Sequence, residues 1–177
     1  MIRRPTLRPP REKENLPARD IAIANRHARL QLDRREVADM IRLLDESGAA
    51  LAPASSAIPA GDLSVVFLTD AELARLHGAF MNDPSTTDVI TFGGNSLLGL
   101  AGEICVSADT AADYATAHRQ DFSTELTLYV VHGWLHLAGY DDLVPEKKRA
   151  MRRAESRAMR LLQRASAIPK FTLRAKR

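Results

Sequence analysis

Two histidines, His132 and His136, lie four residues apart, and Asp142 follows the second by six residues. Residues i and i+4 are neighbours on one face of a helix, so both imidazoles can bind one metal ion. Gly139 lies between His136 and Asp142, and glycine readily adopts the left-handed conformation that ends a helix. The chain can then turn back and bring Asp142 towards the same ion. Three protein ligands and one open position are typical of a catalytic zinc site.

The residue after the first histidine separates two kinds of metal-dependent hydrolase. Metalloproteases with the motif His-Glu-x-x-His have their general base at that position. This chain has Gly133 there. The ligand spacing therefore predicts a metal site, whereas the missing Glu argues against a hydrolase of peptides or small amides.

Several apolar runs predict the elements that position this motif. Strands are expected over residues 21–24, 63–68, 88–92 and 102–107. Helices are expected after Asp33, after residue 69 or 70, over 108–118, after a Ser123 or Thr124 N-cap, and from Pro145. We therefore predict an α/β (α+β-like) fold, with a small mixed four-stranded sheet packed with about five helices. The metal site is expected at the end of the buried central helix, which carries both histidines.

Charge is unevenly distributed along the 177 residues, although the net charge is only +3. Residues 1–35 have a net charge of +6, residues 36–145 of −13, and residues 146–177 of +10. We expect a flexible basic arm over 1–18, one domain over 19–164, and a basic C-terminal tail over 165–177. Basic ends fit a polyanion partner, because Lys and Arg contacts to phosphate release counterions. Solvated tails without a partner are the alternative interpretation.

Composition excludes several other classes of protein. The single cysteine, Cys105, excludes an internal disulfide framework and fits a reducing cytoplasm. No apolar run approaches the ~20 residues that cross a membrane. The first 20 residues lack the apolar segment of a secretory signal. We therefore expect a cytoplasmic protein with no membrane contact.

The motif at residues 132–142 resembles the signature of the bacterial YbeY family, the metal-dependent endoribonucleases of ribosomal RNA maturation. That signature is roughly His-Gly-x-Leu-His-Leu-x-Gly-Tyr-Asp-His. Residues 87–92 are similar to the family's Thr-Asp-Val-Leu-Ser-Phe, and residues 102–104 to its Gly-Asp-Ile. The resemblance extends from about Ile21 to Leu162. It implies a zinc-dependent endonuclease for single-stranded RNA, acting in small-subunit (16S) ribosomal RNA 3′-end maturation and late ribosome quality control. Its implied partners are ribosomal RNA and the small ribosomal subunit.

The chain differs from the family pattern at three positions. Asp142 replaces the last histidine; a carboxylate can bind zinc, but oxygen ligands also suit other divalent ions. Glu103 replaces an aspartate. Met81 occupies the position of a family arginine on the phosphate side of the cleft, and methionine cannot neutralise a phosphate. The nearest cation must then come from elsewhere, and Arg75 is one candidate.

These observations lead to one hypothesis and two alternatives. His132, His136 and Asp142 hold one Zn²⁺, through which the two histidines act in catalysis, and the nucleophile is either a water or the ribose 2′-hydroxyl. We expect Thr87, Asp88 and Arg75 to contact the substrate. Asp141 either orients a ligand histidine or forms a turn. The alternatives are a ribosome-associated RNA-binding protein with a structural metal, and a metal-dependent hydrolase of another substrate.

Overall fold

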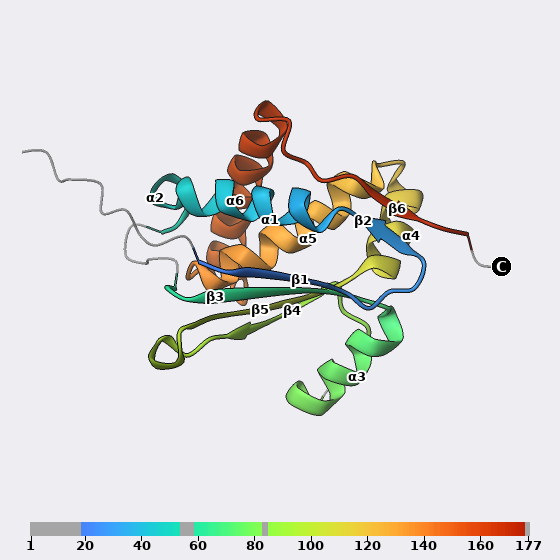
Figure 1. Ribbon diagram of the computed structural model, residues 1–177, viewed down its shortest axis with the longest axis horizontal. Coiled ribbons are helices and arrows are strands. Elements are labelled where there is room, and N and C mark those ends of the chain that lie inside the picture. Colours follow the sequence, from blue (N-terminus) through green and yellow to red (C-terminus); the bar gives the residue numbers. More distant parts are fainter. Residues whose placement is uncertain (1–18, 54–58, 83–84, 176–177) are drawn as a thin grey trace, which may run out of the picture.

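A mixed four-stranded sheet forms the centre of the protein in the computed structural model, which describes residues 19–53, 59–82 and 85–175 (Figure 1). The strand order is β1-β3-β5-β4; the first three strands are parallel, and β4 is antiparallel to β5. Their bounds are β1 (Ile21–Asn25), β3 (Asp62–Leu68), β4 (Val89–Gly93) and β5 (Leu100–Ser107). The predicted mixed sheet is confirmed. The expected arm at residues 1–18 lies outside the described residues.

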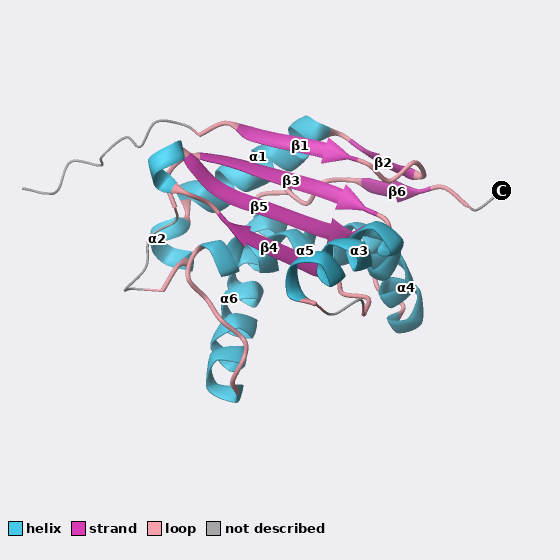
Figure 2. Ribbon diagram, turned by 90° about the horizontal axis from the view of Figure 1, so that it is seen from below, coloured by secondary structure: helices cyan, strands magenta, loops and turns pink. Residues whose placement is uncertain are grey.

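Helices cover both faces of this sheet. Their bounds are α1 (Arg34–Glu46), α2 (Gly48–Leu51), α3 (Asp70–Met81), the 3₁₀ turn η1 (Ser96–Leu98), α4 (Ala108–His118), α5 (Phe122–Leu137) and α6 (Pro145–Arg164). Figure 1 shows α1, α5 and α6 on one face and α3 on the other. In Figure 2, α6 extends past the edge of the sheet that β4 forms. Within the described ranges, no helix combines the length and apolarity that crossing a membrane requires.

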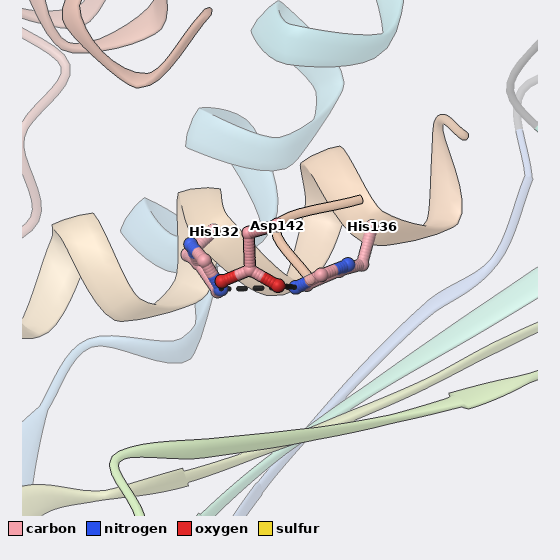
Figure 3. A group of neighbouring side chains, drawn as sticks. All are labelled: His132, His136 and Asp142. Carbon is pink, nitrogen blue, oxygen red and sulfur yellow. Dashed lines mark hydrogen bonds and ion pairs between the residues drawn. The ribbon is translucent and has the colours of Figure 1, made fainter. Parts of the chain in front are cut away.

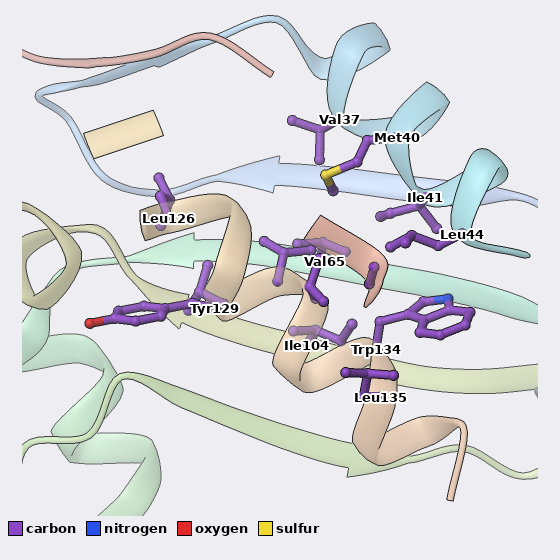
Figure 4. Close-up of a cluster of buried hydrophobic side chains, with 14 of the residues drawn as sticks. Val37, Met40, Ile41, Leu44, Val65, Ile104, Leu126, Tyr129, Trp134 and Leu135 are labelled. Carbon is purple, nitrogen blue, oxygen red and sulfur yellow. The ribbon is translucent and has the colours of Figure 1, made fainter. Parts of the chain in front are cut away.

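The central helix α5 is buried, as its apolar sequence predicts. Trp134 is 1% exposed and lies in the larger core cluster with residues of α1, β3 and β5 (Figure 4). Its indole Nε1 donates a hydrogen bond to Asp45 Oδ1 at 2.9 Å, so the one polar atom of the ring has a partner. Trp134 is therefore a core residue, and α5 is held rigidly against the sheet.

Side-chain caps fix where most helices begin. Asp33 accepts a hydrogen bond from Arg35 N at the start of α1, and Thr69 forms a capping box with Glu72 at the start of α3. The N-cap expected for α5 was wrong: Asp121, rather than Ser123 or Thr124, accepts from Thr124 N at 2.8 Å. Both kinds of side chain cap helices well, so the sequence did not distinguish between neighbouring caps.

The C-terminal tail predicted over residues 165–177 is not a tail throughout. Strand β6 (Phe171–Leu173) pairs antiparallel with β2 (Leu30–Leu32), and neither strand was predicted. Phe171 is 5% exposed and packs with Phe67 at a ring-centroid distance of 5.4 Å. Strands of three residues are too short to show periodicity, and their stability comes from packing against distant parts of the chain.

Candidate metal centre

The turn after α5 brings Asp142 back to the helix that carries the histidines. Gly139 has φ of +95°, as the sequence predicted. Its N–H donates to His136 O at 3.0 Å, and Tyr140 N–H donates to Leu135 O at 3.0 Å. This pair of bonds is a Schellman motif, which reverses the chain at the end of a helix. The glycine in the sequence motif therefore determines where the third candidate ligand lies.

The three predicted ligands form one group (Figure 3). One ligand atom from each of His132, His136 and Asp142 lies within 4.8 Å of the other two. Asp142 Oδ2 is 3.8 Å from His132 Nε2, and its Oδ1 is 3.7 Å from His136 Nε2. The two Nε2 atoms are 2.9 Å apart. All three side chains point to one location at the end of α5.

Each histidine is oriented by a hydrogen bond to its other ring nitrogen. His132 Nδ1 is 2.7 Å from Glu155 Oε1 on α6, and His136 Nδ1 is 3.1 Å from Tyr140 O. A carboxylate and a carbonyl can only accept, so both Nδ1 atoms carry the proton. In the neutral imidazoles, both Nε2 lone pairs then point at Asp142. Partners of this kind fix the tautomer of metal-binding histidines.

The atoms that converge here fit a divalent cation. In the described part of the chain, no hydrogen-bond donor reaches the Asp142 carboxylate, which faces two imidazole nitrogens. Acceptors without a donor repel one another, and a metal ion removes that repulsion. The resident ion would be held by His132, His136 and Asp142. Imidazole nitrogens and carboxylate oxygens are ligands that zinc accepts, and a carboxylate also binds harder ions.

The electrostatics of the two histidines differ because their neighbours differ. Burial lowers the pKa of His132, but the hydrogen bond and charge of Glu155, with the charge of Asp142, outweigh burial and raise it. Burial and the charge of His132 lower the pKa of His136, against the smaller opposing effect of Asp142. His136 therefore stays neutral down to a lower pH than His132 does.

Gly133 is small because the helix lies directly against strand β5. A Cβ built on Gly133 would lie 2.5 Å from Ile104 Cγ2 and 3.1 Å from Thr91 Oγ1. Real Cβ atoms essentially never approach another atom to 2.5 Å. The position that holds the general base of a metalloprotease thus faces the sheet, where there is no room for a Glu.

The residues expected to contact the substrate lie in different places. Asp88 is exposed and directly precedes β4, and its charge contributes to raising the pKa of His132. Thr87 is half-buried and donates to Asp88 Oδ1 at 3.3 Å. Arg75 lies on α3, on the other face of the sheet, and its Nε donates to Ala71 O. The structure therefore does not bring Arg75 to the candidate metal centre.

Asp141 does not orient a histidine. Its carboxylate accepts from Leu143 N at 2.8 Å and pairs with Lys147 Nζ at 2.7 Å, so its role is in the turn. Glu155, which the sequence analysis did not identify, orients His132 instead. One signal was present: Glu155 is the only acidic residue within the strongly basic stretch 147–177. Met81 is the last residue of α3, and its side chain lies outside what the structure describes.

Three other side chains that could contact RNA or react, those of Tyr140, His27 and Cys105, have structural roles instead. Tyr140 OH donates to Leu51 O at 2.8 Å and accepts from Arg157 Nη2 at 2.9 Å. His27 is buried, with Nε2 3.1 Å from Asp109 Oδ1, which excludes a direct RNA contact. Burial, with the nearby Glu103, raises the pKa of the Cys105 thiol to about 12. Cys105 is therefore an unreactive core residue at neutral pH.

Comparison with known proteins identifies the family of the chain. The sequence model of the family "Endoribonuclease YbeY" matches residues 22–163. A protein of that name from Protochlamydia amoebophila is 40% identical over 107 residues, which cover 58% of this chain and 71% of the relative. The counterpart from Chlamydia caviae is 35% identical over 112 residues, covering 59% and 71%. A Thermotoga maritima protein solved in solution shares the fold, with a TM-score of 0.53 and 21% identity over 83% of this chain and 94% of that one.

The family match contains every element that builds the candidate metal centre, from β1 through α5 and its turn to Glu155 on α6. The relatives are identical to this chain at more than a third of the aligned positions. The chain belongs to the endoribonuclease YbeY family.

Proposed function

We propose that this protein is a metal-dependent endoribonuclease that cleaves single-stranded RNA in small-subunit ribosomal RNA maturation. The observation that carries the proposal is the group of His132, His136 and Asp142, which lies within the residues that match the family model "Endoribonuclease YbeY". The proposed partners are ribosomal RNA and the small ribosomal subunit, and the proposed location is the cytoplasm. Zn²⁺ is the proposed ion.

The exposure of the ligands supports a catalytic rather than a structural metal. The side chains of His132, His136 and Asp142 are 20%, 29% and 33% exposed. Among the residues that the structure describes, no fourth side chain joins the group. Structural zinc sites have four protein ligands, whereas catalytic sites keep one position for water or substrate. An exposed group of three fits the second kind.

The residues of this chain would bind and orient the reacting groups. His132 and His136 are held by Glu155 and the Tyr140 carbonyl, so their Nε2 atoms keep a fixed direction during the reaction. When bound, a divalent ion would lower the pKa of a water from about 15.7 towards 7 and polarise a phosphoryl oxygen. Asp88 is exposed and just precedes β4, and the proposal assigns it a contact with the substrate.

A combined measurement of metal content and cleavage tests this function. Purified protein is analysed for bound metals and incubated with single-stranded RNA, with and without a chelator. We expect about one zinc per chain and chelator-sensitive cleavage, and the His136→Ala variant should lose both. Chelation should leave the fold intact, because the larger core does not depend on the ligands. Metal without cleavage of any RNA, or unfolding on chelation, would instead support a binding protein with a structural metal.

A further inference from the structure

Helix α6 carries a basic surface beside the candidate metal centre. It contains two lysines and six arginines. Some are already paired: Lys147 with Asp141 at 2.7 Å and Arg149 with Glu146 at 2.8 Å. In the described part of the chain, the side chains of Lys148 and Arg152 make no hydrogen bond or ion pair, and both residues are exposed. Their charges are therefore free to meet an anion.

The contact between α6 and α5 shows which side of α6 faces the centre. Glu155 reaches His132 Nδ1 at 2.7 Å. Arg152 and Lys148 precede Glu155 by three and seven residues, so they lie on the same side of the helix as Glu155, nearer its N-terminus. The buried residues of α6 (Met151, Ala154, Ala158 and Leu162) lie next to this side and hold it against the core. Lys148 and Arg152 therefore lie on the side of α6 from which Glu155 reaches the centre.

The charge of the centre makes a nearby cation necessary for an anionic substrate. Asp142 and Glu155 together offset the charge of a divalent ion. The electrostatic attraction of a phosphodiester to these groups is therefore weak when the metal is bound, and the phosphodiester is repelled when the metal is absent. Arg75 cannot compensate, because α3 lies on the other face of the sheet.

We propose that Lys148 and Arg152 bind the RNA backbone at the phosphates that flank the cleaved bond. The inference rests on the proposed function for its substrate, and it assigns the phosphate-binding cations of this chain to α6. Helix α6 itself extends past the β4 edge of the sheet (Figure 2), so an RNA strand bound along it would run from the metal ligands past that edge. A base-independent contact of this kind suits single-stranded RNA, in which the phosphates are the common feature.

The expected effect follows from counterion release. Each phosphate contact with a single strand contributes about −0.7 to the slope of log K against log salt. Removing two contacts should therefore flatten the slope by about 1.4 and weaken binding about 25-fold at ~0.1 M salt. The cleavage KM should rise by a similar factor while kcat stays nearly constant, because the contact is the same in the ground and transition states.

The test compares two doubly substituted proteins with the same loss of charge. Lys148→Gln/Arg152→Gln removes the proposed cations. Arg153→Gln/Arg160→Gln removes two exposed arginines from the opposite side of α6. Binding of a fluorescent twelve-nucleotide oligouridine is measured by anisotropy over a salt series in chelator, so that cleavage plays no part. Metal content and thermal unfolding verify that both proteins keep the fold and the site.

We expect the first pair to lose affinity and salt slope as calculated, and the second to change affinity less than about threefold. Equal losses in the two pairs would show an effect of net charge alone and overturn the proposal. Normal binding by the first pair would also overturn it, even if the wild type cleaves RNA. If the wild type binds through Lys148 and Arg152 but cleaves no RNA, the proposed nuclease fails while the binding surface stands.

Discussion

The hydrogen bond from His132 to Glu155 should set how tightly the centre holds its metal. Glu155 is the one group on α6 that contacts a candidate ligand, and its carboxylate is 2.7 Å from His132 Nδ1. A bond this short to an ionised acceptor is of the strong, charge-assisted kind. Substituting Glu155 removes the orientation of the ring and the added basicity of Nε2, without removing a ligand.

The size of the effect can be graded with two substitutions. Loss of such a partner typically weakens metal binding by about 10- to 100-fold, or about 1.4 to 2.7 kcal/mol. Glu155→Gln keeps an acceptor oxygen but loses the charge, so we expect about tenfold. Glu155→Ala loses both and should approach about 100-fold. In the metal-free protein, both substitutions should lower the pKa of His132, because Glu155 raises it.

Zinc affinity would be measured by competition with a chromophoric chelator, and the His132 pKa by NMR titration of its imidazole protons. Glu146→Gln is the matched control, since Glu146 lies on the same helix and pairs with Arg149 rather than with a histidine. Unchanged zinc affinity in both Glu155 variants would refute the reasoning. So would an equal loss in Glu146→Gln, because the effect would then come from the charge of α6 as a whole.

Three further predictions concern the framework around the centre. Phe171→Ala should lower the free energy of unfolding by about 3–5 kcal/mol in a denaturant titration, whereas Thr172→Ala on the exposed side of β6 should cost less than about 1 kcal/mol. Gly133→Ala should cost about 1–3 kcal/mol and lower the Tm, because the new Cβ would overlap Ile104; an unchanged Tm would contradict that packing. Burial raises the pKa of Glu125 in the folded protein. The protonated carboxyl therefore stabilises the fold below the ordinary pKa of Glu, and this contribution is lost as the pH rises through the raised pKa. The unfolding free energy of Glu125→Gln should therefore rise relative to wild type between pH 4 and pH 7, and a constant difference would exclude the titration of Glu125.

The sequence predicted that the three candidate ligands would lie together because they are close to one another in the chain. His132, His136 and Asp142 span eleven residues, and their positions follow from helix geometry and one glycine-dependent turn. The four main strands were also predicted, since each is a long apolar run with clear ends. Propensity and spacing act over short distances, and these features depend on nothing further away.

The features that could not be predicted depend on distant parts of the chain. Glu155 contacts His132, which lies 23 positions earlier in the chain, and β6 pairs with β2 near the opposite end of the domain. Arg75 was considered as a substrate contact because Met81 occupies the position of a family arginine and another cation had to replace it, but the sequence did not show that α3 packs on the other face. Which face a helix covers is decided by tertiary packing, and no local pattern on α3 distinguishes the two faces of this sheet.

The unequal distribution of charge has a consequence for the chemistry of the centre. A metal site needs acceptors that are negative or neutral. Here the charges of Asp142 and Glu155 already offset a divalent ion, so the negative charge of a bound phosphate is left without a balancing cation. The positive charge for the substrate must then come from side chains that do not pair with these carboxylates. Lys148 and Arg152 meet that condition, because they lie on the side of α6 that Glu155 holds against the centre and remain exposed and unpaired within the described residues. Ligand support and substrate binding are thus combined on one helix.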